Sequence, residues 1–354
     1  MPSDETEGRQ GPRNASLFAM AVTLLLVLPS AVFGTVSSRP WGVSAPEVLL
    51  PVLRPVDAPA VEAAVLPPAK TEVTIKLEAR TVLAMFHEQD YFIDQVRSGD
   101  TAVPRLVLTD LPKDLGALDS VDDRKSVFVK TMLPLVLMAN EQIEADRRRL
   151  EKLQAVRDGG ESLAPQDQRW VLELADRYGV KLDTGGDLRP LLRKVDIVPP
   201  SLALAQAAEE SGWGTSRIAQ KGNVLFGQTT SNTEHRGITP RNRVPGETWR
   251  YRAFDDPKAA VEAYVHNLNT HQAYGQFRAM RASLRKQGKP LEGIQLVAAL
   301  EKYSERGTDY VKTIRTLIRK NGLDDFDRAV LRQDGPEQVI RPEPAGVQQV
   351  AAKR

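Results

Sequence analysis

Apolar and polar positions follow a helical period over most of this chain. The longest such stretch covers residues 121–156, where apolar side chains form a broad stripe up to Ile143 and charged residues dominate afterwards. This pattern predicts one long helix with a solvated face in its charged part. Pro165 begins a further helix of about thirteen residues, and residues 185–187 open a short third one. Residues 71–195 are therefore predicted to be a helical N-terminal region.

A second group of helices is predicted beyond residue 199. Two prolines, at 199 and 200, mark the start of a short apolar helix that stops at Gly212. The helical pattern is then lost over residues 227–257, and weak alternation over residues 244–254 predicts a short hairpin or a long loop. Asp256 and Pro257 form a capped helix start, and helices are expected over residues 257–271, 291–302 and 308–320.

The two ends of the chain are expected to lie outside the folded part. Residues 17–36 are predominantly apolar and uncharged, and such a run can cross a hydrocarbon core of ~30 Å. Arg9 and Arg13 precede it, which favours export of the rest of the chain, so residues 1–37 form either a cleaved signal peptide or an uncleaved anchor. The Pro- and Ala-rich residues 38–70 are predicted to be an extended linker, and residues 326–354 a disordered tail.

Composition excludes several kinds of chemistry. The chain of 354 residues carries a net charge of only +2, which offers no electrostatic argument for nucleic acid as a partner. Cysteine is absent, so disulfide bonds and thiol catalysis are excluded. The four histidines lack the spacing to other ligands that a metal site needs, and neither a metal nor a cofactor is expected.

One carboxylate stands in an unusual place. Glu210 lies in the last turn of the helix that begins at Pro200, shortly before Gly212 and Trp213. The partial negative charge of a helix C-terminus and a neighbouring indole both favour the neutral acid, and a glycosidase uses a protonated carboxyl group as its general acid. The same residues also fit an exposed acid before a helix-ending glycine, with the tryptophan in the core. The pattern alone does not choose between Glu209 and Glu210.

Four sequence blocks, in the right order, resemble one family. The bacterial glucosaminidase family of peptidoglycan hydrolases has a signature that is similar to Leu-Ala-Gln-Ala-Ala-Glu-Glu-Ser-Gly-Trp-Gly-Thr-Ser at 204–216 and Asn-Val-Leu-Phe-Gly-Gln at 223–228. The Bax-type members of Gram-negative bacteria add two blocks that residues 263–271 and 302–311 resemble. One departure is visible, because Val224 occupies the place of the asparagine that precedes Leu-Phe-Gly in the family. The likeness is clearest over residues 199–323.

This resemblance implies a fold and an activity. It implies a mainly α, lysozyme-like glucosaminidase domain over residues 196–325, with a small irregular or β-hairpin lobe and with the helical region of residues 71–195 packed on it. It also implies cleavage of the β-1,4 bond after N-acetylglucosamine in peptidoglycan glycan strands, with Glu210 as the general acid and no cofactor. Such an enzyme works in the periplasm or cell envelope, and it is anchored in the inner membrane if its N-terminal segment stays uncleaved.

Hydrolysis usually needs a second carboxylate at about 5 to 10 Å from the acid, and this one is less clear. In similar enzymes it comes from the irregular segment after Leu-Phe-Gly, where this chain has Glu234 and Glu247. Glu247 is favoured because Gly246 and Thr248 flank it on the expected hairpin, whereas Asp255 is expected to cap the next helix. Either acid is equally well explained as a solvated loop residue.

Further residues are expected to meet the substrate. Tyr303 matches a family tyrosine with an active-site role, and its hydroxyl is expected to orient a water molecule or the N-acetyl group, although a tyrosine at a helix end also fits a core position. Substrate-binding roles are expected for Trp213 and Phe226 as walls of the cleft, Gln228 and Asn267 as hydrogen-bonding amides, and Trp249 as a stacking surface. Core or hairpin packing is the alternative for the aromatic residues.

Two other functions fit the same sequence. A lytic transglycosylase works with a single acid and releases anhydro-muramic ends, which suits a chain whose second carboxylate is undefined. A catalytically silent wall-binding or regulatory module would keep the cleft without turnover. The intact Glu210-Ser-Gly-Trp-Gly block favours the hydrolase.

Overall fold

The described part of the chain forms one compact unit. The computed structural model describes residues 69–183, 185–244 and 246–344, and all of them belong to the unit Val65–Arg354. The expected signal peptide or anchor (residues 1–37) and nearly all of the expected linker (residues 38–70) lie outside the described residues. Within the described ranges, no helix is long and apolar enough to span a bilayer.

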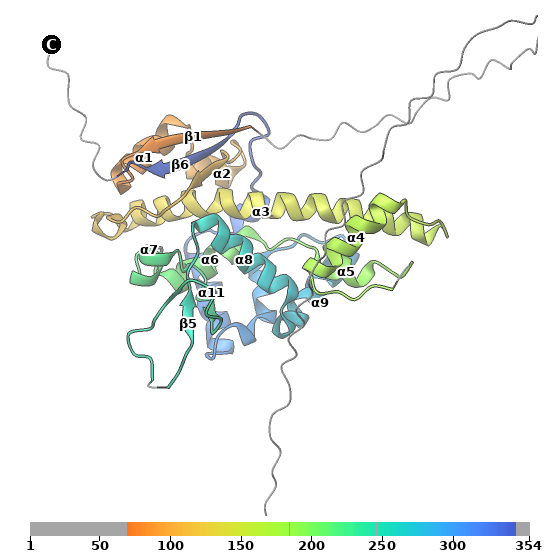
Figure 1. Ribbon diagram of the computed structural model, residues 1–354. Coiled ribbons are helices and arrows are strands. Elements are labelled where there is room, and N and C mark those ends of the chain that lie inside the picture. Colours follow the sequence, from red (N-terminus) through yellow and green to blue (C-terminus); the bar gives the residue numbers. More distant parts are fainter. Residues whose placement is uncertain (1–68, 184, 245, 345–354) are drawn as a thin grey trace, which may run out of the picture. The chain divides into compact units, whose positions relative to one another are not determined.

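A single long helix, α3 (Val121–Asp158), runs through the unit where one helix was predicted. Ser120 caps it by accepting a hydrogen bond from the backbone N–H of Asp123. Every side chain from Val127 to Met138 is buried, because other elements enclose this half of α3 on opposite sides (Figure 1). A helix that is apolar all round is a core helix. The enclosing elements include β2 (Leu106–Leu108), α1 (Ala79–Glu88), α6 (Pro200–Ser211) and α8 (Pro257–Thr270).

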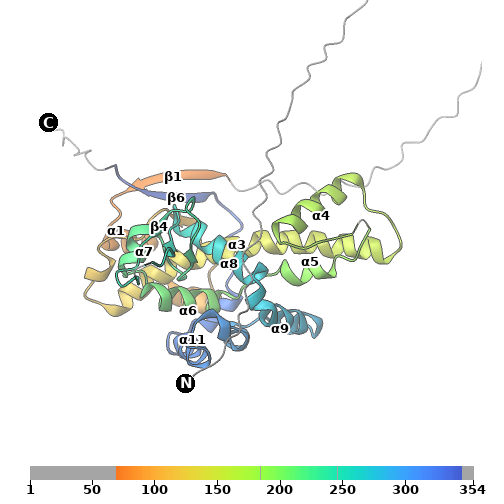
Figure 2. The ribbon, with the colours of Figure 1, turned by 60° about the horizontal axis from the view of Figure 1, so that its bottom comes forward.

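The second half of α3 carries a small hydrophobic core of its own. Helices α4 (Pro165–Arg177) and α5 (Arg189–Lys194) lie beside it (Figure 2). Helix α4 begins at the proline that predicted it and spans 13 residues. The buried apolar side chains of this second core are Leu150, Leu153, Val171, Leu174, Ala175, Tyr178, Leu188, Leu191 and Val195.

The helix that carries Glu210 is enclosed over most of its length. Every side chain of α6 from Pro200 to Ala208 is buried. Its alanines leave room for the neighbouring helices to approach closely, and these are α3, α10 (Gly293–Leu296) and α11 (Thr308–Lys320). Gly293 comes so near that a Cβ there would lie 2.7 Å from the backbone nitrogen of Leu202, so only glycine fits without a shift.

Most of the helices around α6 match the predicted ranges. Asp256 caps α8 by accepting a 2.7 Å hydrogen bond from the backbone N–H of Ala259. The helix expected over residues 291–302 is instead α10 followed by two 3₁₀ turns, η3 (Val297–Ala299) and η4 (Glu301–Tyr303). Packing overrides local helix propensity here, since Leu296, Val297 and Leu300 are all fully buried. The remaining elements are α2 (Ile93–Ser98), η1 (Leu115–Ala117), α7 (Arg217–Gly222), η2 (Gln272–Tyr274), α9 (Gly275–Lys286) and η5 (Asp324–Arg328).

A small antiparallel sheet forms where a hairpin or loop was predicted. The stretch 244–254 supplies one strand, β5 (Arg250–Arg252). This strand lies between β3 (Thr229–Thr230) and β4 (Gly237–Ile238), with Tyr251 opposite Thr229 on one side and Ile238 on the other. The lobe is therefore a three-stranded sheet built from two separate segments.

The C-terminal stretch corrects one expectation. Residues 326–354 were expected to be disordered, but β6 (Glu337–Pro342) is the middle strand of a parallel sheet with the order β1-β6-β2. Its partner β1 (Lys70–Ile75) begins at the last residue of the predicted linker and continues into the region predicted to be helical, and Val73 lies opposite Ile340. The tail was misjudged because its apolar residues are few, yet Ile340 is buried against the core. Residues 345–354 lie outside the described part.

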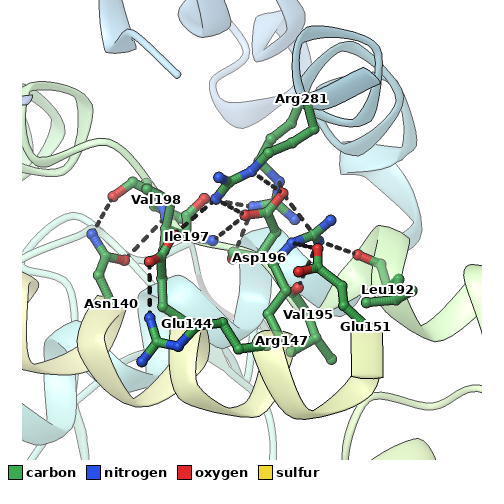
Figure 3. A network of polar contacts seen from close by, with 12 residues as sticks. Asn140, Glu144, Arg147, Glu151, Leu192, Val195, Asp196, Ile197, Val198 and Arg281 are labelled. Atoms are coloured by element: carbon green, nitrogen blue, oxygen red, sulfur yellow. Dashed lines mark hydrogen bonds and ion pairs between the residues drawn. The ribbon is translucent and has the colours of Figure 1, made fainter. Parts of the chain in front are cut away.

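A buried polar network joins α3 to the start of α6 (Figure 3). Asn140 on α3 exchanges two hydrogen bonds with the backbone of Val198, at 2.8 and 3.1 Å. Asp196 is only 2 % exposed and forms ion pairs with Arg147 at 3.4 Å and with the fully buried Arg281 at 3.5 Å. These contacts hold the chain just before Pro200. The predicted helical N-terminal region and the glucosaminidase-like domain, divided at residue 195, also share one hydrophobic core.

Candidate active site

Glu210 lies in the last turn of α6, where the helix ends at Gly212 in the left-handed conformation (φ +59°). Burial raises the pKa of Glu210, and the neighbouring carboxylate of Glu209 adds to the rise. A hydrogen bond with Tyr310 and the charge of Arg306 act in the opposite direction without cancelling it. The acid therefore keeps its proton to a higher pH than an exposed glutamate.

The neighbouring acid is held in a different way. The carboxylate of Glu209 forms an ion pair with Arg306 at 2.6 Å. Within the described ranges, no ion pair involves Glu210. The structure thus distinguishes two acids that the helical pattern left equivalent: Glu209 is paired with an arginine, and Glu210 is the partly buried acid with a raised pKa.

The backbone of the Leu-Phe-Gly segment lies directly against Glu210. Gly227 has a φ of +65°, and a Cβ added to it would stand 2.7 Å from Oε2 of Glu210. Any side chain there would push the carboxyl group away or expel the loop. Glycine is needed at this position for both its backbone conformation and its small size.

The displaced asparagine of this segment has a structural role. Asn223 ends α7 with a φ of +50°, and its side-chain amide donates to the carbonyls of Phe254 and Asp255, each at 3.3 Å. Val224, which departs from the family pattern, is fully buried. Asn223 therefore ties the Leu-Phe-Gly loop to the start of α8.

Tyr303, which comes much later in the sequence, contacts the same Leu-Phe-Gly loop. Its hydroxyl donates a 2.9 Å hydrogen bond to the carbonyl of Phe226, directly before Gly227. Its ring stacks on Tyr310 with centroids 5.5 Å apart and planes at 12°. Burial raises the pKa of Tyr303, and the acidic side chains beside it, Tyr310 first and Glu210 among them, raise it further. Tyr303 thus lies close to Glu210, while its hydroxyl is engaged by the backbone.

A groove of about 740 Å³ opens beside these residues. Its walls are the segment from Phe226 to Thr229, one face of α8, and the rings of Tyr274 and Tyr303. Four of the residues with predicted site roles line it together: Phe226, Gln228, Asn267 and Tyr303. The groove also includes Gly227, which brings it next to the Glu210 carboxyl group.

The two amides of the groove differ in their partners. The side-chain oxygen of Gln228 is buried without a hydrogen-bond partner. The Asn267 side chain hydrogen-bonds Tyr274, whose pKa burial raises. A buried acceptor without a partner costs free energy, so Gln228 would gain by turning this oxygen toward a hydrogen-bond donor.

The structure places other expected site residues away from the groove. Glu247 is exposed and accepts hydrogen bonds from the indole N–H of Trp249 at 2.8 Å and from the backbone N–H of Val244 at 3.3 Å. The Trp249 ring lies edge-on against Tyr251 at 5.5 Å. Glu234 is exposed in the loop between β3 and β4. None of these side chains lines the groove.

Trp213 also lies elsewhere. Its ring meets Phe128 of α3 edge-on at 5.8 Å, and the ammonium group of Lys125 stands 5.2 Å from its centre. It lines a separate hollow of about 630 Å³ between α2, α3 and the end of α11. The dehydration of Glu210 therefore involves Gly227 and the tyrosines beside it, whereas Trp213 faces another side of the unit.

Sequence reasoning missed several residues of the site. Glu262 is the one carboxylate among the described residues that line the groove; it is exposed on α8 and pairs with Lys258 at 3.8 Å. Glu262 could have been found from its position on one face of α8, because the residues of this helix that line the groove are spaced three or four apart: 259, 262, 263, 266, 267 and 270. Gln206 and Tyr310 were missed because their role depends on contacts between helices. Within the described ranges, no three acidic, histidine or cysteine side chains gather as a metal site.

Comparison with known proteins agrees with this geometry. Residues 187–323 match the family described as mannosyl-glycoprotein endo-β-N-acetylglucosaminidase, a range that contains α6, the Leu-Phe-Gly loop, α8 and Tyr303. No solved structure matches the chain. The family indicates a hydrolase that acts on glycans.

A curated relative extends the match. Over 211 residues the chain is 34% identical to the protein named Protein bax of Escherichia coli (strain K12), covering 59% of this chain and 73% of that protein. The chain therefore belongs to the glucosaminidase family, as a Bax-type member. Its fold is the mainly α, lysozyme-like glucosaminidase domain that the resemblance implied.

Proposed function

We propose that this protein cleaves the β-1,4 bond after N-acetylglucosamine in peptidoglycan glycan strands, with Glu210 as the general acid. One observation carries the proposal: a partly buried carboxyl group, with a raised pKa and no ion pair within the described ranges, stands against Gly227, which lines the groove. Family membership supports a glycan as the substrate.

The chemistry follows from the proton that Glu210 retains. The glycosidic oxygen leaves as a hydroxyl only if it is protonated as its bond to the anomeric carbon breaks. Glu210 delivers this proton, and a positive charge develops on the sugar ring. A water molecule then bonds to the anomeric carbon and gives up its proton to a carboxylate. Gln228 and Asn267 line the groove where acetamido groups of the glycan would accept or donate hydrogen bonds.

The second carboxylate has three candidates. Glu234 and Glu247 belong to the small lobe, where either could approach a bound strand only if the lobe closed over the groove. Glu262 already lines the groove. Each can serve as the base or nucleophile that an inverting or retaining hydrolase needs.

A lytic transglycosylase is the second candidate function. Its support is that, among the described residues, the groove holds a single exposed carboxylate, Glu262, besides the adjacent Glu210. Such an enzyme needs no second acid, because the muramic 6-hydroxyl attacks within the substrate and an anhydro end is formed.

The site of action is proposed from the N-terminal sequence. An apolar segment at residues 17–36 and a linker that ends where β1 begins would carry the unit into the periplasm, with the inner membrane as anchor if the segment is retained.

Product analysis distinguishes these functions. Isolated sacculi are digested with the full-length protein, and the fragments are reduced with borohydride and identified by mass spectrometry. Reduced N-acetylglucosamine ends are expected. Anhydro-muramic ends would replace the hydrolase by the transglycosylase. Binding to sacculi without any fragments would show a silent wall-binding module.

A further inference from the structure

A chain of hydrogen bonds runs through the interior to Glu210. The hydroxyl of Tyr264 on α8 donates to Oε1 of Gln206 at 2.7 Å. Nε2 of Gln206 donates to the hydroxyl oxygen of Tyr310 on α11 at 3.0 Å. The Tyr310 hydroxyl in turn hydrogen-bonds the Glu210 carboxyl group. Three helices thus contribute one link each.

The hydrogen bonds of this series run in one donor-to-acceptor direction. An amide nitrogen only donates, so the Tyr310 oxygen accepts from Gln206, and its own hydrogen is left for Glu210. At the other end of the Gln206 amide, Oε1 accepts from Tyr264. With the amide in this orientation, the Tyr310 hydroxyl faces the acid as a donor.

All three side chains are sealed from water. Tyr264, Gln206 and Tyr310 are each fully buried. Buried polar groups of this kind cannot exchange their partners for solvent, which fixes the geometry of the chain. The Tyr264 ring is also stacked on Phe226 at 3.9 Å, and the Tyr310 ring on Tyr303 at 5.5 Å. Both ends are thereby tied to walls of the groove.

We propose that Tyr264, Gln206 and Tyr310 are positioning residues that hold the Glu210 carboxyl group in one orientation, so that its acidic proton faces the groove. This inference rests on the proposed function of Glu210 and goes beyond it. Tyr310 occupies one acceptor position of the carboxyl group, and Gly227 leaves space beside Oε2. A mobile carboxyl group would spend less time aimed at the glycosidic oxygen.

Removing the last donor has a defined effect. In Tyr310→Phe the ring and its stacking remain, but Glu210 loses a hydrogen bond that favours its charged form, so its pKa is expected to rise further. The limiting kcat at low pH is expected to fall roughly tenfold, and the alkaline limb of the pH profile to move to higher pH. The other groups that face Glu210 stay in place: Glu209, Tyr274, Tyr303 and Arg306.

A matched control exists in the same fold. Tyr91 is also fully buried, but its hydroxyl has no hydrogen-bond partner and it packs against Phe86, in the region of α1 and α2. Tyr91→Phe removes a hydroxyl oxygen from an equally buried ring and leaves the hydrogen bonds from Tyr264 to Glu210 intact. Tyr264→Phe removes the first link and is expected to change Glu210 in the same direction as Tyr310→Phe, to a smaller extent.

The deciding readout is the titration of Glu210 itself. It is followed in the full-length protein by NMR of ¹³C-labelled glutamate carboxyl groups, and the Glu210 signal is assigned by its loss in Glu210→Gln. A raised pKa in Tyr310→Phe and Tyr264→Phe, with no change in Tyr91→Phe, supports the chain. An unchanged titration in folded Tyr310→Phe would overturn it, and Tyr264→Phe alone decides if Tyr310→Phe does not fold.

The titration does not depend on turnover. If the wild-type protein releases no fragments from sacculi while the titration responds as expected, the proposed function fails and the positioning chain stands. If fragments are released but the pKa of Glu210 is unchanged in Tyr310→Phe and Tyr264→Phe, the positioning role fails and the proposed function stands.

Discussion

A Cβ on Gly227 would stand 2.7 Å from Oε2 of Glu210, a closer approach than side-chain atoms tolerate. The loop after α7 and the end of α6 therefore meet without a side chain between them. This contact keeps water from one side of the acid and makes Gly227 part of the wall that dehydrates it.

We expect Gly227→Ala to abolish most activity while the fold is retained. The added methyl group displaces the Glu210 carboxyl group, and the left-handed backbone adds a strain of about 1 kcal/mol. Initial rates on sacculi and thermal melting of both proteins test this.

Gly288→Ala is the matched control for Gly227→Ala. Gly288 has nearly the same φ, +64°, but a Cβ there meets nothing within 4 Å. It should therefore show the same strain and a normal rate. Equal rates for the two variants would mean that the contact with Glu210 is unimportant.

The raised pKa of Glu210 predicts a stability that depends on pH. A carboxyl group whose pKa is raised by folding contributes stability at low pH, and this contribution is lost as the pH rises through the raised value. The Glu210→Gln variant stays neutral throughout. Its Tm should exceed that of the wild type at about pH 8 and approach it at about pH 4. A constant difference in Tm across this range would show that the pKa is not raised.

Activity should follow the same group. Because the acid must be protonated to donate, kcat is expected to decline as the pH rises through the raised pKa of Glu210. The rate is measured on soluble glycan fragments over the pH range where Tm shows the protein to be folded. A rate that increased steadily with pH would assign Glu210 the role of a base.

The second carboxylate can be found by comparing three neutral variants. If water is activated from the groove wall, Glu262→Gln should lower kcat by a factor on the order of a hundred, as loss of acid–base assistance does. Glu247→Gln and Glu234→Gln should then stay near the wild-type rate. The reverse order would place the second acid in the small lobe, and three unaffected variants would favour the transglycosylase.

The Asp196 network should dominate stability. Burial opposes the ionised form of Asp196, but the arginines around it outweigh burial and lower its pKa. Asp196→Asn leaves Arg281 fully buried without its anionic partner, which costs about 3 to 5 kcal/mol. Urea unfolding measures this cost. The exposed pair of Glu72 and Arg341 serves as the control, since Glu72→Gln should leave the free energy of unfolding nearly unchanged. Equal effects would contradict the network's role.

The elements predicted correctly are those whose signals are local. Helix α3 follows from a long apolar period, α4 and α6 from prolines at their first positions, and α8 from the cap at Asp256. Strand β6 could not be predicted in this way, because its partner β1 is more than 260 residues earlier in the sequence. Parallel strands are also not joined by a tight turn whose residues would reveal the pair.

The site shows the same division. Phe226, Gln228, Asn267 and Tyr303 were predicted because sequence blocks shared with a family carry them, and the structure brings them into one groove. The chain from Tyr264 to Glu210 could not be predicted, because it links α6, α8 and α11 through side chains whose meeting depends on tertiary packing. Trp213 was placed beside Glu210 by sequence proximity, but a left-handed turn at Gly212 and Trp213 directs the indole toward α3.

The most direct test of the central claim compares two adjacent acids. Glu209 is paired with Arg306, whereas the partly buried Glu210 stands against Gly227 and has a raised pKa. The measurement is the rate at which reducing ends are released from sacculi by wild type, Glu209→Gln and Glu210→Gln, each shown to be folded by its melting curve. We expect Glu209→Gln to retain most of the wild-type rate and Glu210→Gln to release no ends above background. Release by Glu210→Gln at the wild-type rate would contradict its role as the acid.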